Sequence, residues 1–334
     1  MFEKLNSKQV DLLNIGLILI SLLIAIELPF KLFLFSYAVL GPLHYLTEIN
    51  WLQQKNFFIP NPKKWILPLV VLTILLSIYP IVLLSQIEYP NSYESGLNFL
   101  AQNSSTFILA GFLFAVFLIF VKGLKKMLIG LCLSILFSFI LNHLIPKYFI
   151  FVGIFIPTII HVYLFTGLFM LYGARKGKSK PGIIGVLVLA CIPFIIAFLN
   201  LDITDYRISE ETLSTFMSSN MISVNASLFK MFKLNPSENF QLLSLIGFKI
   251  QIFISFAYTY HYLNWFSKTS IIGWKQSLNK KKTISIVMLW LVSIALYYYD
   301  YKTGFIALFF LSFLHVFLEF PLNVVSIKGI FSKN

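Results

Sequence analysis

The sequence predicts an all-α, polytopic membrane protein of about ten transmembrane helices. Apolar residues make up 58% of the chain and charged residues only 12%, an apolar share well above that of soluble domains. Apolar stretches of about 20 residues recur along the whole chain, as a hydrocarbon core roughly 30 Å thick requires. The alternation of apolar and polar residues that marks a membrane barrel is absent, and an open strand would leave backbone groups unpaired in lipid. Each stretch is therefore expected to be a helix.

The expected spans follow one another with short connections. In chain order they are residues 12–28, 31–50, 65–86, 106–122, 127–146, 148–172, 182–200, 240–266, 283–300 and 303–326. Only two connections are long, 87–105 and 201–239, and both fall on the same side of this arrangement. We expect a single transmembrane helical domain over residues 1–334, with 201–239 as its longer extracytoplasmic loop. That loop is either a plain connection or a lid over the bundle.

Basic residues mark the ends of alternate spans. Lys4 and Lys8 precede the first span, and clusters of lysine and arginine follow the second, fourth, sixth, eighth and tenth. This places 19 of the 26 basic residues on one side, so the positive-inside rule puts both termini in the cytoplasm. The net charge of +13 thus indicates topology and contact with anionic membrane lipids, and it argues against a nucleic-acid partner.

Four of the five histidines lie inside expected spans: His44, His161, His261 and His315. Their spans all run in the same direction, and three of the four lie about 13 residues into them, roughly 20 Å deep at 1.5 Å per residue. A histidine in hydrocarbon is costly without a partner, and neutral imidazole is the commonest metal ligand. We expect these four side chains to converge on a buried metal ion. His143 closes the fifth span and is expected at the membrane interface.

Two carboxylates accompany the histidines. Apart from residues at span ends, Glu48 and Glu319 are the only acidic residues inside the spans. Each follows a histidine, His44 or His315, by four residues and therefore shares its helical face. We expect both to be catalytic, by binding the metal, orienting a ligand or handling protons. A structural pairing of each glutamate with its histidine is the alternative.

Aromatic residues surround the histidines in the sequence. They are Tyr45, Trp51, Tyr163, Phe165, Tyr258, Tyr260, Tyr262, Trp265 and Phe317. An aromatic wall suits a long conjugated or isoprenoid substrate that enters from the bilayer. In a chain with 36 Phe and 16 Tyr, such neighbours are also expected by chance and as interfacial belts.

Four short segments occur in a recognisable order: GPLHYLTE, then IIH, then the aromatic-flanked His261 leading to a tryptophan, then LHVFLEF. In this order they resemble the motifs of the Brp/Blh family of membrane β-carotene 15,15′-dioxygenases. The resemblance implies Fe(II) held by the four histidines, with Glu48 and Glu319 beside it. It also implies O₂-dependent cleavage of a carotenoid, or of a related lipid-soluble isoprenoid, to retinal-type products. The expected location is a bacterial inner (cytoplasmic) membrane.

The segments also depart from the family's motifs. Tyr45 replaces a glycine, and Glu48 replaces an aspartate. The third motif has one histidine instead of two, because Ala257 and Trp265 stand four residues to either side of His261. These departures indicate a divergent relative, with either a changed substrate or lost activity.

Three other functions fit the same residues. One is a different membrane metalloenzyme acting on lipids, such as a desaturase or hydroxylase, although the chain lacks the HxxHH and HxxxH clusters of those enzymes. Another is a transporter with a His/Glu proton relay, a class that often shows inverted repeats and broken helices. The third is a catalytically silent scaffold.

Overall fold

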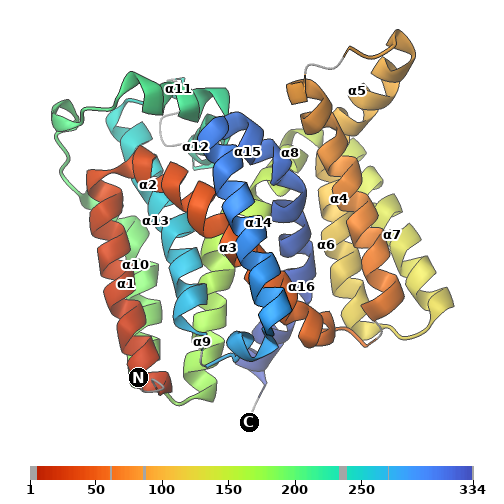
Figure 1. Ribbon diagram of the computed structural model, residues 1–334, viewed down its shortest axis with the longest axis horizontal. Helices are drawn as coiled ribbons and strands as arrows, with labels where there is room; N and C mark the ends of the chain where they lie inside the picture. The colour runs from red at the N-terminus through yellow and green to blue at the C-terminus, as the bar shows by residue number, and fades with distance from the viewer. Residues whose placement is uncertain (1–5, 61, 86–87, 233–238, 270, 333–334) are drawn as a thin grey trace.

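All regular structure in the described part of the chain is helical, which confirms the predicted fold class (Figure 1). The computed structural model describes residues 6–60, 62–85, 88–232, 239–269 and 271–332. Apolar helices of membrane-spanning length identify the protein as an integral membrane protein.

Every expected span coincides with a helix or with a run of consecutive helices. The uninterrupted helices are α1 (Ser7–Glu27), α4 (Pro62–Ser85), α6 (Ser104–Phe120), α7 (Leu124–Leu144), α10 (Lys180–Phe198), α13 (Leu245–Ser267) and α14 (Lys280–Tyr299). The interrupted ones are α2 (Pro29–Phe35), η1 (Ser36–Leu40) and α3 (Gly41–Gln54); α8 (Pro146–Phe155), η4 (Ile156–Phe165) and α9 (Thr166–Lys176); and α15 (Tyr301–Ala307) and α16 (Phe309–Phe331).

Short helices fill the connections. They are η2 (Asn56–Phe58), η3 (Asn91–Tyr93), α5 (Glu94–Gln102), η5 (Ile203–Asp205), α11 (Glu210–Ser218), α12 (Ile222–Met231) and η6 (Trp274–Ser277). The long connection 201–239 therefore contains two α-helices. They lie at the end of the bundle opposite the two termini (Figure 1).

The number of helices apolar enough to cross a membrane is smaller than ten. Eight described segments qualify, and a ninth is the pair α5 and α6, bent by 54°. The expected span 240–266 differs, because α13 is 23 residues long but carries polar residues such as Gln251 and Asn264. Sixteen of its residues are buried, so protein and not lipid surrounds it. A helix inside a bundle tolerates polar groups that hydrocarbon would exclude.

Side-chain caps explain where several helices begin. Asn6 and Gln9 form a reciprocal capping box at the start of α1. Ser179, Ser244 and Asn279 each accept a backbone N–H at the starts of α10, α13 and α14. Each cap satisfies a backbone donor that the first helical turn leaves free. The helices that carry the basic clusters are thus defined locally at their ends.

The four histidine-bearing helices end at the same face of the bundle (Figure 1). Near the end of α3, the Asn50 amide donates to Ser277 Oγ at 2.6 Å, in the loop that follows α13. At the end of α9, the Arg175 guanidinium donates to the carbonyl oxygen of Ile330, at the end of α16, at 2.6 Å. The four helices therefore run parallel to one another, which brings their mid-points to one level.

Candidate metal centre

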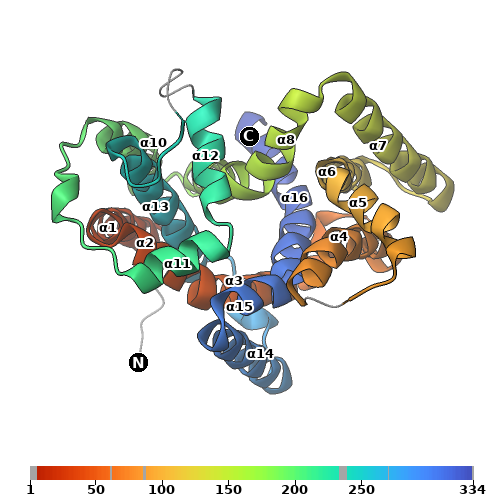
Figure 2. The same cartoon turned by 90° about the horizontal axis from the view of Figure 1, so that it is seen from above.

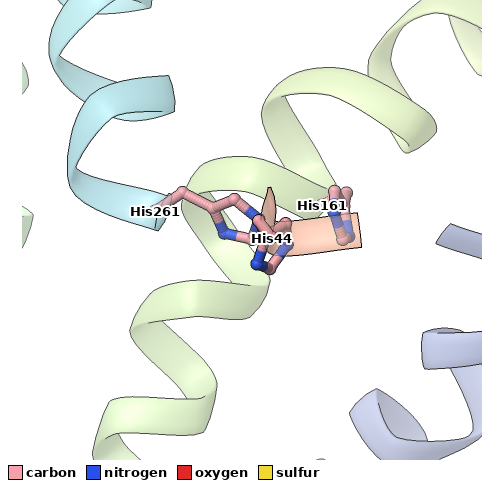
Figure 3. A group of neighbouring side chains, drawn as sticks. All are labelled: His44, His161 and His261. Atoms are coloured by element: carbon pink, nitrogen blue, oxygen red, sulfur yellow. Dashed lines mark hydrogen bonds between the residues drawn. The ribbon is translucent and has the colours of Figure 1, made fainter. Parts of the chain in front are cut away.

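Four imidazole rings meet in the interior of the bundle. His44 comes from α3, His161 from η4, His261 from α13 and His315 from α16, and none is more than 6% exposed. Neighbouring ring centroids lie 4.7 to 5.4 Å apart around the group. Figure 3 shows three of them, with His261 reaching from α13 toward His44 and His161. The structure thus brings together the four histidines expected to bind metal.

Irregular helical turns position two of these histidines. His161 lies inside the π-helical segment η4, and η1 ends four residues before His44. Pro157 lacks an amide hydrogen, and the Thr166 hydroxyl donates to the Val162 carbonyl at 2.8 Å, so the backbone pairing of this segment differs from that of an α-helix. π-Helical turns are rare and frequently occur at functional sites.

Two of the rings have one nitrogen occupied by a neighbour. The Thr166 hydroxyl lies 2.8 Å from Nδ1 of His261. Oε2 of Glu319 lies 2.9 Å from Nδ1 of His161. Both contacts leave Nε2 facing the centre, and such partners set the orientation of metal-binding imidazoles in proteins.

The Nε2 atoms have the spacing of neighbouring metal ligands. His44 Nε2 lies 3.1 Å from His261 Nε2, and His161 Nε2 lies 3.3 Å from His315 Nε2. Two neighbouring nitrogens bound to one metal at about 2.0–2.1 Å would be roughly 2.8–3.4 Å apart in octahedral or tetrahedral geometry. Ligand atoms of His44, His161 and His261 all lie within 4.8 Å of one another. The residues present therefore fit a single metal ion held by imidazole.

The two glutamates have different relations to this centre. Glu48 Oε2 lies 3.1 Å from His44 Nε2, the nitrogen that also faces His261. Ligand atoms of His44, Glu48 and His315 form a second group within 4.8 Å. Glu319 instead contacts the outer nitrogen of His161. Glu48 is thus placed to share a metal with the histidines, whereas Glu319 is placed to orient one of them.

Several buried polar atoms near the centre have no hydrogen-bond partner among the described residues. They include Nδ1 of His44, Oδ1 of Asn264 and Nδ2 of Asn323. Buried polar groups in proteins are almost always paired, so such a concentration calls for an explanation. The contact between His44 and Glu48 is compatible with a purely structural pairing of these two side chains. Such a pairing does not explain the other unpaired atoms.

The histidines lie between two cavities of unequal size. On the side away from the termini, His161, His261 and His315 line a cavity of about 560 Å³. On the other side, His44 and His261 line one of about 20 Å³, together with Glu48, Glu319 and Asn264. The large cavity has room for a lipid chain, whereas the small one accommodates about one water molecule.

Aromatic side chains support the rings and form the wall of the large cavity. Tyr45 stacks on His315 with centroids 4.1 Å apart, and its hydroxyl lies 3.0 Å from that of Tyr262. The Trp265 indole donates to Thr47 Oγ1 at 3.0 Å and lies beside His44. The other aromatic residues that line the large cavity include Phe33, Tyr37, Tyr258, Phe305, Phe309 and Phe313.

All six site residues predicted from the sequence lie in this centre, and His143 is exposed at the last turn of α7. The sequence analysis did not predict a role for Thr166. The feature that could have indicated one is its hydroxyl group, five residues after His161 on the same expected span. The sequence analysis also missed Tyr37 and the segment between α11 and α12, which line the large cavity. Nothing in the local sequence of that segment indicates proximity to a histidine.

Comparisons of the chain with protein-family models, with curated proteins and with solved structures find no match.

Proposed function

We propose that the protein is a membrane-embedded metalloenzyme: a histidine-iron oxygenase that acts on a carotenoid or a related isoprenoid lipid. The observation that carries this proposal is the placement of three of the four imidazoles at the inner end of an aromatic cavity of about 560 Å³. Metal ligands and space for a long apolar molecule thus meet at one point inside the bundle. The order of histidine motifs, which resembles the Brp/Blh enzymes, supports the same substrate class.

The donor set favours a metal of the first transition series. Imidazole nitrogens suit iron, copper, nickel and zinc, and one carboxylate beside them is compatible with Fe(II). Fe(II) held by His44, His161, His261 and His315, with Glu48 beside it, would supply the activation of O₂. In the proposed assignment, Glu48 is a ligand or lies against one, and Glu319 fixes the ring of His161.

The remaining residues bind the substrate and exclude water. The flat faces of Tyr37, Tyr258 and Phe309 offer contact to a conjugated chain, because aromatic side chains bury large areas at low entropic cost. Tyr45 and Tyr262 hold each other through their hydroxyls and keep polar atoms of this wall satisfied. The apolar cavity holds the reacting part of the lipid away from bulk water.

The location proposed for the protein is a bacterial inner membrane, with both termini in the cytoplasm. The bundle has both termini at one end (Figure 1). The basic clusters of the sequence lie at the helix ends and in the connections on that same side. In this orientation the large cavity lies toward the extracytoplasmic side. Reporter fusions after Lys180 and after Lys282 should therefore report cytoplasm, and fusions near Ser92 and Ser218 the outside.

A His/Glu-relay transporter is the second candidate, because three spans are interrupted, at η1, at η4 and between α15 and α16. Discontinuous helices are common at transporter binding sites. Against it, the cavity on the terminal side of the histidines is only about 20 Å³, so the described residues leave no wide passage through the centre at this point.

The test is product analysis with purified protein loaded with Fe(II). We expect β-carotene or a related isoprenoid to be converted in the presence of O₂, and His315→Ala to abolish conversion while leaving the protein inserted. His143→Ala, which changes the exposed fifth histidine, should retain activity. If the iron-loaded protein leaves isoprenoids unchanged, the carotenoid proposal fails. Other lipids then test the broader metalloenzyme proposal, and a transport assay in vesicles tests the second candidate.

A further inference from the structure

The large cavity changes character along its length. Its inner end is formed by His161, His261 and His315, and its middle by aromatic and aliphatic side chains. Its outer end contains Lys302 and the stretch 218–224 between α11 and α12. Lys302 precedes His315 by thirteen residues, which at 1.5 Å per residue corresponds to about 20 Å. The cavity is therefore long, apolar in the middle and polar at both ends.

One charged side chain lies at the outer end. Lys302 is exposed, it makes no ion pair in the described part of the chain, and no carboxylate lines the cavity with it. The nearby Asp300 interacts with the charge of Lys302 but makes no close ion pair with it, and its Oδ2 accepts the backbone N–H of Thr303 at 2.7 Å. Tyr301 anchors the same turn by donating from its hydroxyl to the Leu34 carbonyl at 3.0 Å. The bundle thus holds at the mouth a lysine that no carboxylate of the described residues contacts directly.

A buried hydroxyl stands at the same mouth. Ser219 is 3% exposed, lines the cavity, and its Oγ has no hydrogen-bond partner among the described residues. Phe216 holds this segment in place by packing edge-on against Phe30, with centroids 5.1 Å apart. Asn220 then turns the chain with φ 55°, in the left-handed region. A buried hydroxyl without a hydrogen-bond partner and an exposed lysine, both on the wall of one cavity, are groups that an anionic ligand would satisfy.

We propose that Lys302 and Ser219 form a head-group site for the carboxylate of a single-chain amphiphile, whose apolar chain runs along the aromatic wall to the histidines. The inference rests on the proposed function, because it assigns a chemical class to the substrate of the same centre. A monocarboxylate matches the single cation at the mouth, and one apolar chain matches the single elongated cavity. Among the isoprenoids that the proposed function allows, an isoprenoid acid would satisfy both groups, whereas a symmetrical hydrocarbon such as β-carotene would leave Lys302 and Ser219 without a ligand.

The experiment measures binding, independently of turnover. The protein is placed in nanodiscs of phosphatidylcholine and titrated with retinoic acid, retinol and β-carotene, with quenching of intrinsic tryptophan fluorescence as the signal. Wild-type protein should bind retinoic acid about two- to fivefold more tightly than retinol, the gain expected of one partly exposed charge pair. Lys302→Gln should abolish that preference and leave retinol binding unchanged. Lys230→Gln, which removes an exposed lysine of α12 outside the cavity, should keep it.

Equal affinities of the wild-type protein for acid and alcohol would overturn the head-group site. Equal loss of preference in both lysine variants would also overturn it, because a general surface charge would then explain the effect. Iron content of the same samples reads the proposed function separately: Lys302→Gln should retain iron. A protein that prefers the acid but binds no iron would refute the metalloenzyme and keep the head-group site. A protein that binds iron but does not prefer the acid would refute the head-group site and keep the metalloenzyme.

Discussion

Successive helices of similar length have opposite surroundings in this protein. Of the 23 residues of α13, 16 are buried, whereas only Ile286, Ser293 and Tyr297 are buried among the 20 residues of α14. The view from above places α13 inside the bundle and α14 at its edge (Figure 2). α14 is apolar enough to be a membrane span by composition, and α13 is not among the segments that qualify.

The difference between α13 and α14 shows that a helix's mean hydropathy reports its exposure to lipid. A helix that faces lipid must be apolar on its outer surface, so its composition reveals it. A helix enclosed by other helices has no such requirement. The buried residues of α13 accordingly include four polar ones, Gln251, Thr259, His261 and Asn264. The long helix that fails the composition test for a span is therefore one of the four segments that contribute a histidine to the metal centre.

The largest effect is expected from removing imidazoles at this centre. Replacing both His44 and His161 by alanine removes two ligand positions, so the purified protein should lose its bound metal, with affinity reduced by more than about 100-fold. Metal content by mass spectrometry is the measurement, and His143→Ala is the control because that ring is exposed on α7. A double variant that retains stoichiometric metal would place the ion elsewhere.

The next largest effect is a difference in metal affinity between variants of the two glutamates. Glu48→Gln is expected to weaken metal binding by about 100-fold and Glu319→Gln by about tenfold, because only Glu48 lies on the Nε2 side of its histidine. Competition with a metal-sensitive dye gives both affinities. Equal effects of the two substitutions would contradict the difference in placement.

Gln251→Leu makes α13 more apolar and should nevertheless destabilise the protein. The Gln251 amide donates to the Pro29 carbonyl at 3.0 Å, and its oxygen accepts from Asn225 at 2.9 Å. Loss of both bonds leaves two buried groups unpaired, which is expected to lower the free energy of unfolding by about 2–3 kcal/mol. Equilibrium unfolding in mixed micelles measures this. Met288→Leu on the exposed face of α14 is the control and should change it by less than about 0.5 kcal/mol.

The smallest effect concerns close packing beside the centre. A Cβ on Gly111 in α6 would lie 2.5 Å from the ring of Phe317, which is fully buried two residues beyond His315. Gly111→Ala should therefore cost about 1–2 kcal/mol, since the ring has little room to move. On Gly16 in α1 a Cβ meets nothing within 4 Å, so Gly16→Ala should leave stability unchanged or slightly raised. The same unfolding experiment compares the two variants. Equal free energies of unfolding for Gly111→Ala and Gly16→Ala would contradict close packing between α6 and α16.

Much of the candidate site was visible in the sequence because membrane helices restrict where polar residues occur. His44 and His315 are each followed by a glutamate after four residues, in spans where such residues are costly. The direction of the spans, read from the lysine clusters, placed the histidines at a similar depth. The different placements of Glu48 and Glu319 were not visible, because both stand at the same spacing from a histidine in sequence.

The sequence by itself determined the fold class, the approximate helix positions and the set of residues at the centre, because burying a charge or an imidazole in hydrocarbon is too costly to occur without a reason. Tertiary structure alone decided the enclosure of α13, the π-helical turn at His161, and the orientation of the His261 and His161 rings by Thr166 and Glu319. It also placed Ser219 and Lys302 at the mouth of the cavity that ends at the histidines. These features depend on contacts between helices far apart in the chain, and local periodicity carries no information about such contacts.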